Sequence, residues 1–524
     1  MGPFRILGTN VRTAVSDPII VVGAGPVGLT AALELARRGV PVRIVDRLAE
    51  PTTESRAIIV HARSLEMFER LGLVDELIQA GVRTTAMEMH SDGEVVARIP
   101  LDLVDSPFPY SVTIAQTETE RILTKALAEY GVTVERGVTL TGLTQDEHGV
   151  RVVLERADGS HETAGTGWLV GADGGHSRTR QLVGSALAGK FKGEKFLMGD
   201  VNADHDLDPH SMYTFFSPHD GPLLVFPMQG DRLRLIANIS ADEQRTATQE
   251  WLQEVADERA ERPIRIRGSR WLTVFEVHHA QVPEYRIGRV LLAGDAAHVH
   301  SPAGGQGMNT GLQDAHNLAW KLSLVSTGQA GPAMLDSYHA ERHPVGAQVI
   351  RFAGTLTRVG TLANPIAQKL RNKGMHLLTG LAPVRQAMAD HTEETAVAYR
   401  KSPIVVQGRG SGELHAGDFL PAAGPELHAA LAEAHEHVLL TVIVKGPVPT
   451  PVDGMTARQL LVGAAATAPT GYDAVFQDPD GLAAARYGLP NGGRIMVRPD
   501  GYVAAIAPLD EDTPLHRYQA LLQA

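Results

Sequence analysis

The chain has 524 residues, 43% hydrophobic and 21% charged, a balance typical of a folded globular protein rather than a disordered or fibrous one. It contains no cysteine, which excludes disulfide frameworks, thiolate zinc sites and dithiol redox chemistry and suits a cytoplasmic location, which we expect. The formal net charge is −12, so neither nucleic acid nor an anionic membrane is an expected partner. No apolar run approaches the roughly 20 residues of a spanning helix.

The first segment, residues 1–17, carries two arginines but no apolar stretch of the kind that a secretory signal requires. We expect it to be a disordered leader or a wrongly assigned start of the chain. A βαβ unit of the usual length follows. Pro18–Val22 is an apolar, β-branched strand, Pro26–Arg38 has helical periodicity, and Val42–Val45 is a second strand ending at Asp46.

A glycine motif, Gly23-Ala-Gly25-Pro-Val-Gly28, lies between the first strand and the helix. Gly23 permits a tight turn, Gly25 lets the backbone approach a pyrophosphate, and Gly28 lets the helix pack closely on the strand. Asp46 is placed to accept hydrogen bonds from a ribose. The context predicts dinucleotide binding at the helix N-terminus. The alternative is a structural glycine turn, and the motif alone does not choose between NAD and FAD.

The rest of the chain predicts three domains, the first interrupted by the second. Alternating patterns with Pro and Gly turns indicate a mostly β region over about 190–285, and a polar linker is expected at 402–412. Further helices are expected at 64–77, 118–130, 309–326 and on to about 400, and further strands at 132–134, 150–154, 168–170, 290–293, 438–444, 474–477, 495–497 and 502–506.

Two further motifs carry a family resemblance. Gly171–Arg178 resembles the DG motif of class A flavoprotein monooxygenases, and Gly294–His298, followed by Pro302 and Gly304–Asn309, resembles their GD motif. With the glycine motif, their order and spacing match that family, which includes para-hydroxybenzoate hydroxylase and phenol hydroxylase. The resemblance implies an α/β fold: a Rossmann-like FAD-binding domain with an inserted β-rich substrate domain and a C-terminal thioredoxin-like domain.

The implied domain limits are 17–81, 116–188 and 285–403 for the FAD-binding domain, whose third part includes a helical segment. The substrate domain takes 82–115 and 189–284, and the thioredoxin-like domain takes 404–524. Without cysteines this last domain cannot perform dithiol chemistry. Its expected role is structural or oligomeric, and a homodimer is one expectation.

The resemblance also implies how FAD is held. Asp295 would bind ribityl hydroxyls, and the glycine loop before Met308 would offer amides and a positive helix end to the flavin pyrimidine edge. Arg56 matches an arginine beside the pyrophosphate and nicotinamide, with a surface salt bridge as its alternative. Gln116 matches a glutamine near adenosine, or is a strand-end amide, and Asp173 serves a cofactor or pairs with Arg178. The expected cofactor residues are Gly23, Gly25, Gly28, Asp46, Arg47, Arg56, Gln116, Asp173, Asp295, Pro302, Gly305, Gly307, Met308 and Asn309.

The implied activity is an FAD-dependent, NAD(P)H-consuming monooxygenase. NADPH, or NADH, would dock transiently, and one atom of O2 would reach an aromatic substrate through a flavin C4a-hydroperoxide. Composition and the third domain are similar to actinobacterial hydroxylases of polycyclic polyketides, which suggests such a substrate and a role in antibiotic biosynthesis. Baeyer–Villiger oxygenation, a flavin reductase or dehydrogenase, and a non-enzymatic scaffold remain alternatives.

No catalytic residue is identified from the sequence. The candidate substrate-lining residues are Phe215, Phe226, Met228 and His300, with core packing as the alternative for the first three. His278–His279 and His298 with His300 lack a third ligand at a sensible spacing, so no metal is expected. His298 is expected to hold the GD turn, and Trp320 to lie in the core.

Overall fold

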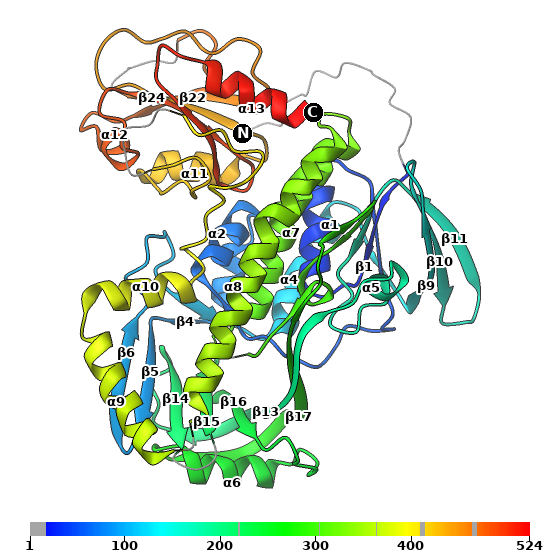
Figure 1. Ribbon diagram of the computed structural model, residues 1–524, viewed down its shortest axis with the longest axis vertical. Helices are drawn as coiled ribbons and strands as arrows, with labels where there is room; N and C mark the ends of the chain where they lie inside the picture. The colour runs from blue at the N-terminus through cyan, green and yellow to red at the C-terminus, as the bar shows by residue number, and fades with distance from the viewer. Residues whose placement is uncertain are drawn as a thin grey trace.

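The computed structural model describes residues 17–217, 221–302, 304–362, 364–408, 414–463 and 469–523. Apart from Asp17, the predicted leader lies outside these ranges, as do residues 409–412 of the predicted linker. Figure 1 shows a sheet-and-helix body beside α1 and β1, a β-rich sheet with α6 at the bottom, and a C-terminal domain at the top left. Within the described ranges no helix is both long enough and apolar enough to cross a membrane.

The first body is built on a six-stranded sheet in the order β18-β19-β12-β1-β2-β8. All neighbours are parallel except the edge strand β18. The strand β1 is buried along its whole length, as expected for a parallel strand covered on both faces. The bounds are β1 Ile19–Val22, β2 Val42–Asp46, β8 Val134–Arg136, β12 Leu169–Gly171, β18 Arg286–Ile287 and β19 Val290–Leu292. The predicted βαβ unit is confirmed.

An eight-stranded sheet, in the order β20-β17-β13-β16-β15-β14-β5-β6, forms the β-rich body. The helix α6 (Gln249–Arg259) covers one face, capped by the Thr248 side chain, which accepts from the Trp251 amide. The other face packs against Ile58 and Ile59 of the first body. The bounds are β5 Ala86–Ser91, β6 Glu94–Pro100, β13 Ala188–His205, β14 Ser211–Ser217, β15 Gly221–Pro227, β16 Arg232–Ile239, β17 Ile264–Gln281 and β20 His298–Val299.

Two small sheets complete the core of the molecule. The strands β9 (Val138–Gln145), β10 (Val150–Arg156) and β11 (His161–Thr166) form an antiparallel sheet at the right of Figure 1. The strands β3 (Ile59–Val60), β7 (Ser111–Thr113) and β4 (Val82–Thr84) form the other.

The prediction of a single helix over 64–77 is wrong. The segment divides into α2 (Ala62–Arg70) and α3 (Val74–Ala80), because Gly72 between them adopts φ +72°, a left-handed conformation that ends a helix. The other helices of this body are α1 Pro26–Ala36, α4 Gln116–Glu129, α5 Arg178–Leu182, α7 Gln306–Ser326, α8 Asp336–Gly360, α9 Pro365–Thr379 and α10 Ala382–Thr392.

The C-terminal domain is a five-stranded mixed sheet in the order β23-β22-β21-β24-β25. The strands β21, β22 and β23 are parallel, and β24 and β25 run antiparallel to their neighbours. The bounds are β21 Val438–Val442, β22 Arg458–Gly463, β23 Ala474–Gln477, β24 Gly493–Val497, β25 Val503–Ala507, α11 Pro425–Glu433, α12 Leu482–Arg486 and α13 Thr513–Gln523. The sheets and helices agree with the predicted α/β fold class, in which a β-rich domain is inserted into a Rossmann-like domain and a further domain follows at the C-terminus.

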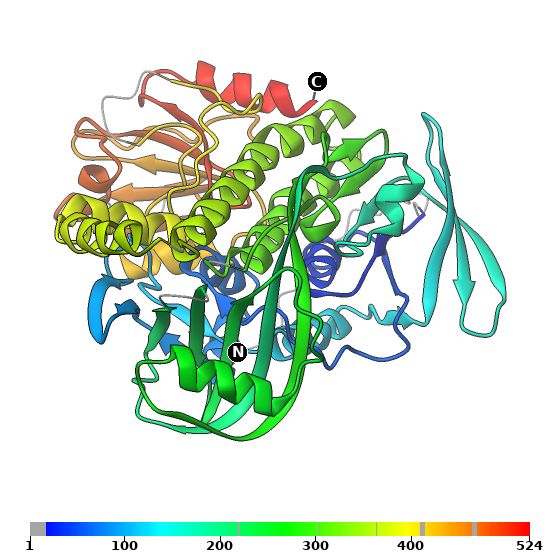
Figure 2. The ribbon, with the colours of Figure 1, turned by 60° about the horizontal axis from the view of Figure 1, so that its bottom comes forward.

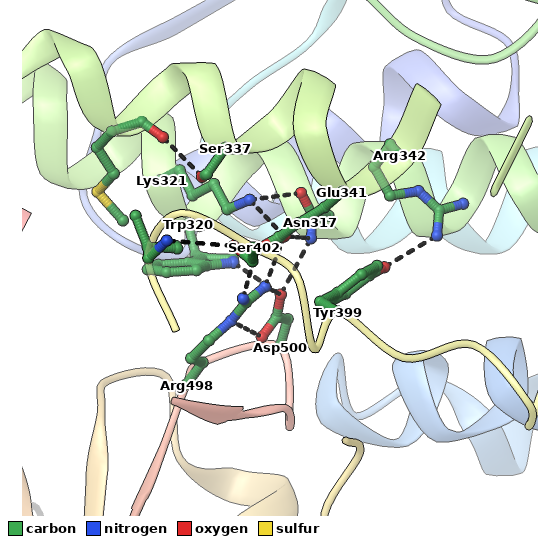
Figure 3. Close-up of polar contacts among 12 residues, drawn as sticks. Asn317, Trp320, Lys321, Ser337, Glu341, Arg342, Tyr399, Ser402, Arg498 and Asp500 are labelled. Atoms are coloured by element: carbon green, nitrogen blue, oxygen red, sulfur yellow. Dashed lines mark hydrogen bonds and ion pairs between the residues drawn. The ribbon is translucent and has the colours of Figure 1, made fainter. Parts of the chain in front are cut away.

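A buried polar network joins the C-terminal domain to α7 and α8 (Figure 3). Arg498, in the turn between β24 and β25, donates to both carboxylate oxygens of Glu341 at 2.7 and 2.9 Å and also pairs with Asp500. Lys321 donates to Glu341 at 2.6 Å, and Trp320 donates to Asp500 at 3.0 Å. Because all five residues are buried, the two bodies share one desolvated set of charges.

Candidate functional site

Three turns meet at one edge of the six-stranded sheet. Gly23 follows β1, Asp173 closely follows β12, and Asp295 closely follows β19, and these three strands are adjacent and parallel. Ligands of open parallel sheets bind at the carboxyl ends of the strands. The fold therefore brings the three predicted motifs to one place (Figure 2 shows the same bodies from below).

The three glycines of the first turn have different reasons to be glycine. Gly23 has φ +102°, and a Cβ there would lie 2.3 Å from the carbonyl oxygen of Ala172. A Cβ on Gly28 would lie 1.9 Å from the carbonyl oxygen of Gly23. A Cβ on Gly25 would meet nothing within 4 Å. Close packing therefore requires glycine at positions 23 and 28. Gly25 instead faces open space before the N-terminus of α1, where an anion is favoured.

Asp46 lies at the end of β2, where its carboxylate accepts from the amides of Ala24 at 2.6 Å and Leu48 at 2.8 Å. These bonds tie the glycine turn to the second strand. Each oxygen keeps a second lone pair that a ribose hydroxyl could use. Asp46 thus fits the predicted role while also holding the turn in place.

Asp173 hydrogen-bonds to the start of the short helix α5, whose N-cap is Ser177. Its carboxylate accepts from the Thr179 amide at 2.8 Å, from the Thr179 hydroxyl at 3.0 Å and from Ser177. Arg178, its alternative partner in the sequence analysis, is instead exposed and contacts Gln181 at 3.4 Å. Asp173 therefore shapes the turn rather than pairing with Arg178.

Asp295 is accessible to solvent and makes no hydrogen bond to any residue that the structure describes. Desolvation by the protein atoms around the carboxyl raises its pKa, while the charges of His298 and Arg56 lower it. The preceding Gly294 packs on Val27 of α1, to which a Cβ would approach within 2.9 Å. The carboxyl is thus held beside the glycine turn with its acceptor atoms unused.

The N-terminus of α7 offers a second set of backbone donors. Gly304 and Gly305 adopt φ +95° and +66°, and the helix has no side-chain cap. The amides of the first turn, including those of Gly307 and Met308, therefore lack intrahelical acceptors. The Gly305 amide donates to the Pro302 carbonyl at 2.9 Å, which fixes the loop. This arrangement can hold a polar, electron-rich edge of a ligand.

Asn309 uses its side chain within the protein. Its side chain is fully buried, accepts from the His61 amide at 2.9 Å, and donates to the carbonyls of Ile59 at 3.0 Å and Gly305 at 2.9 Å. The hydrogen bonds of the Asn309 side-chain amide therefore connect α7 to the segment before α2. Any contact of Asn309 with a cofactor would come from its main chain.

The remaining cofactor candidates lie around this edge. Arg47 and Arg56 are exposed, and Arg56 contacts Glu54 at 3.4 Å. Gln116 accepts from the Ala57 amide at 3.0 Å, which holds the segment that carries Arg56. Arg56 is therefore positioned by its backbone, and its guanidinium remains accessible.

The substrate candidates divide between the two faces of the eight-stranded sheet. Phe215 is fully buried under α6, whereas Phe226 lies on the opposite face with Ile58 and Ile59. Met228 lines a cavity of about 210 Å³ with Thr113 and Arg232, among others. Only Phe226 and Met228 lie toward the first body, so Phe215 is a core residue in this structure.

His300 lies beside the α7 loop, where a Cβ on Gly307 would be 3.7 Å from its ring. Its Nδ1 hydrogen-bonds the Ser301 carbonyl at 3.0 Å, and its Nε2 is buried without a partner in the described structure. Burial lowers the pKa of His300 to about 4, so the ring is neutral near pH 7. In the described ranges no three His, Asp or Glu side chains gather as a metal site.

Several residues that hold the site were missed in the sequence. Arg180 joins the second turn to the third by donating to the carbonyls of Gly175 at 2.6 Å and Ala296 at 3.1 Å. Asp314 accepts from the Gly294 amide at 3.1 Å and contacts His298 at 2.7 Å, and Arg342 holds Asp314. The only sequence signal for Asp314 is a charged residue within the predicted helix over 309–326. The expected role of His298 in holding the GD turn agrees with this contact.

Comparison with known proteins decides the family. A family model described as an FAD binding domain matches residues 17–353. The chain belongs to this family. The 6-methylpretetramide 4-monooxygenase of Streptomyces rimosus is 35% identical over 525 residues, covering 96% of this chain and 93% of its own. The pentachlorophenol 4-monooxygenase of Sphingobium chlorophenolicum is 38% identical over 342 residues, 63% of each chain.

Among solved structures, the OxyS anhydrotetracycline hydroxylase from Streptomyces rimosus superposes with a TM-score of 0.74 at 28% identity. The match covers 97% of this chain and 99% of that one. The predicted membership among flavin-dependent aromatic monooxygenases is confirmed. The open features of the three turns fit FAD: an unfilled space at Gly25, an unused carboxyl at Asp295 and amides without intrahelical acceptors at α7.

Proposed function

We propose that the protein is an FAD-dependent, NAD(P)H-consuming monooxygenase that inserts one oxygen atom from O2 into an aromatic, polycyclic polyketide-like substrate. The observation that supports it most is the unpartnered Asp295 carboxyl beside the open space at Gly25. These features suit a ligand that is both a polyol and a diphosphate. The named activity of the full-length relative from Streptomyces rimosus supports the substrate class.

Each part of the site would hold a different part of the cofactor. Asp295 would accept from ribityl hydroxyls, the N-terminus of α1 would face the diphosphate, and the first turn of α7 would donate to the pyrimidine edge. When bound, the flavin supplies the redox and oxygen-transfer chemistry. The protein's own contribution is to bind, orient and keep water out.

Arg56 is the residue we assign to the transient nicotinamide cofactor. Its guanidinium is accessible, and its charge acts on Asp295. A planar cation is suited to a diphosphate. We expect Arg56→Ala to slow reduction of the flavin by NADPH while leaving FAD bound, and stopped-flow absorbance would measure it. Comparing the rates of flavin reduction by NADPH and by NADH in the same experiment shows which of the two the protein prefers.

The substrate would lie between the flavin edge and the sheet face that carries Phe226 and Met228. His300, neutral because of its lowered pKa, could accept or donate one hydrogen bond there through Nε2. The cavity that Met228 lines also carries Glu118 and Arg232, and we assign neither of them a proton-transfer role. The contribution that we propose for the chain is shape and orientation.

The division into domains at 17–81, 82–115, 116–188, 189–284, 285–403 and 404–524 is also proposed. The pairing of β5 and β6 with β13–β17 in one sheet supports the insertion. We also propose a cytoplasmic location and a homodimer. Sedimentation velocity would measure the oligomeric state.

One experiment tests the proposed function as a whole. The purified protein is examined for flavin absorbance, then reduced anaerobically with NADPH with and without polycyclic phenols, then exposed to ¹⁸O2. Label in a hydroxylated product supports the proposal. Label in an inserted ester oxygen would indicate Baeyer–Villiger chemistry, reduction without label transfer would indicate a reductase, and failure to bind FAD would refute the assignment.

Two glycine variants give a matched control. Gly25→Val places a side chain in the open space, so we expect folding to persist and FAD affinity to fall at least tenfold, by isothermal titration. Gly28→Val collides with the Gly23 carbonyl, so we expect misfolding. Unchanged FAD affinity in Gly25→Val would mean that the diphosphate lies elsewhere.

A further inference from the structure

A buried polar chain lies directly behind the Gly304–Gly305 loop. His61, Ser111 and Glu393 come from three segments, before α2, at the start of β7 and after α10, and all are fully buried. His61 Nδ1 lies 2.8 Å from the Ser111 hydroxyl, which donates to Glu393 Oε1 at 2.6 Å. His61 Nε2 lies 3.1 Å from the Gly304 carbonyl oxygen.

The partners of the ring fix where the protons are. A carbonyl oxygen only accepts, so Nε2 must carry a hydrogen. Glu393 accepts from the Ala62 amide at 2.6 Å through its other oxygen, and its Oε1 accepts from the Ser111 hydroxyl. The Ser111 oxygen is then an acceptor, and Nδ1 must also carry a hydrogen. With this direction of the Ser111 hydrogen bond, the geometry fits an imidazolium paired with a carboxylate.

The surrounding charges agree with this assignment. Burial lowers the pKa of His61, but the Glu393 charge and its hydrogen bond raise it above the ordinary value. Glu394 adds a further raising contribution, although burial raises its own pKa. Arg342 and Asp314, behind Glu394, are paired with each other at 2.7 Å. His61 is thus the cation nearest the loop in this cluster.

The peptide group between Gly304 and Gly305 is held through both its carbonyl and its amide. The Gly304 carbonyl faces His61, while the Gly305 amide donates to Pro302 at 2.9 Å. A Cβ on Gly305 would lie 3.5 Å from His61 Nε2, so the loop packs directly on the ring. The amides that follow begin α7 and are the ones assigned to the flavin pyrimidine edge.

We propose that His61 is a positioning residue of the flavin site: a buried cation, held by Ser111 and Glu393, that fixes the α7 loop and favours the reduced flavin over the oxidised one. This inference rests on the proposed FAD site. The reduced cofactor gathers negative charge at its N1–C2=O edge, and a cation beyond one peptide stabilises that charge more than the neutral oxidised ring.

The test compares His61→Gln with His316→Gln. Glutamine at 61 can still donate to the Gly304 carbonyl but carries no charge. His316 is an equally buried histidine, 2.6 Å from Glu34, away from the loop. We expect His61→Gln to lower the preference for reduced FAD about tenfold, equivalent to about 30 mV in the two-electron potential, and His316→Gln to leave the potential unchanged.

A second measurement uses the apoprotein and needs no flavin. Nuclear magnetic resonance of labelled histidine should show His61 protonated at both nitrogens at pH 7, and Glu393→Gln should abolish this. A neutral His61 in the native apoprotein, or an unchanged flavin potential in His61→Gln, would overturn the inference. Failure of the native protein to bind FAD would instead refute the proposed function.

Discussion

Replacing Arg498 with methionine should cost the protein a large part of its stability. The side chain is 1% exposed and makes two hydrogen bonds to Glu341 and two to Asp500. Removing one member of a buried ion pair leaves an uncompensated charge and costs about 3–5 kcal/mol. In this variant Lys321 is the only cation of the network left to balance the two buried carboxylates. We therefore expect the free energy of unfolding to fall by about 4 kcal/mol.

A double-mutant cycle shows whether charge is the cause. Adding Glu341→Gln to Arg498→Met leaves one carboxylate and one ammonium in the network, so charge is balanced again. We expect the double variant to be more stable than the sum of the two single losses predicts, by about 2 kcal/mol. The matched exposed control is Arg400→Met, which removes a pair with Asp418 at 2.6 Å and should cost less than about 1 kcal/mol.

Urea unfolding followed by circular dichroism and tryptophan fluorescence measures all four variants. Trp320 belongs to the network, so its fluorescence reports the contact between the two bodies. A loss below about 1 kcal/mol in Arg498→Met, or strict additivity in the cycle, would refute the reasoning. A first transition confined to the C-terminal domain would refute the view that the network joins two bodies into one cooperative unit.

Three further predictions concern single residues. Asn309→Ala leaves the His61 amide and the Ile59 carbonyl buried without partners and should cost about 2–4 kcal/mol, by urea unfolding. Arg180→Met should weaken FAD binding several-fold while leaving the circular dichroism spectrum intact, because Arg180 ties two turns together. Burial lowers the pKa of His437 to about 4, below the unfolded value near 6.5, so stability present above pH 6.5 should fall by up to about 3 kcal/mol as pH drops to 4. His437→Gln should flatten that slope in a pH series of unfolding curves.

The fold and the cofactor edge could be predicted because local rules govern them. Apolar runs predicted the parallel strands, and the glycines of the first turn were identified from the strand and helix on either side. Gly23 and Gly28 have packing reasons that any βαβ turn of this kind shares. The break at Gly72 was missed because apolar periodicity continues across it, and only the left-handed backbone conformation ends the helix.

The side chains that hold the site could not be predicted, because their partners lie far away in the sequence. Asn309 bonds to residues 248 and 250 positions earlier, and Ser111 reaches Glu393 across 282 positions. No periodicity records such pairs. Phe215 is a related case. The alternating pattern places Phe215 on one face of a strand, but it does not show which face of the sheet α6 covers.

The order in which the sheet is assembled has a consequence for synthesis. The strands β1, β12 and β19 are neighbours in space, yet they begin at residues 19, 169 and 290. A ribosome must therefore translate more than half of the chain before the third turn can join the first two, and Asp314 and Arg342 follow later still. The nascent chain has no complete edge of this kind during that time, so capture of the flavin at the proposed site must wait until these residues have emerged from the ribosome.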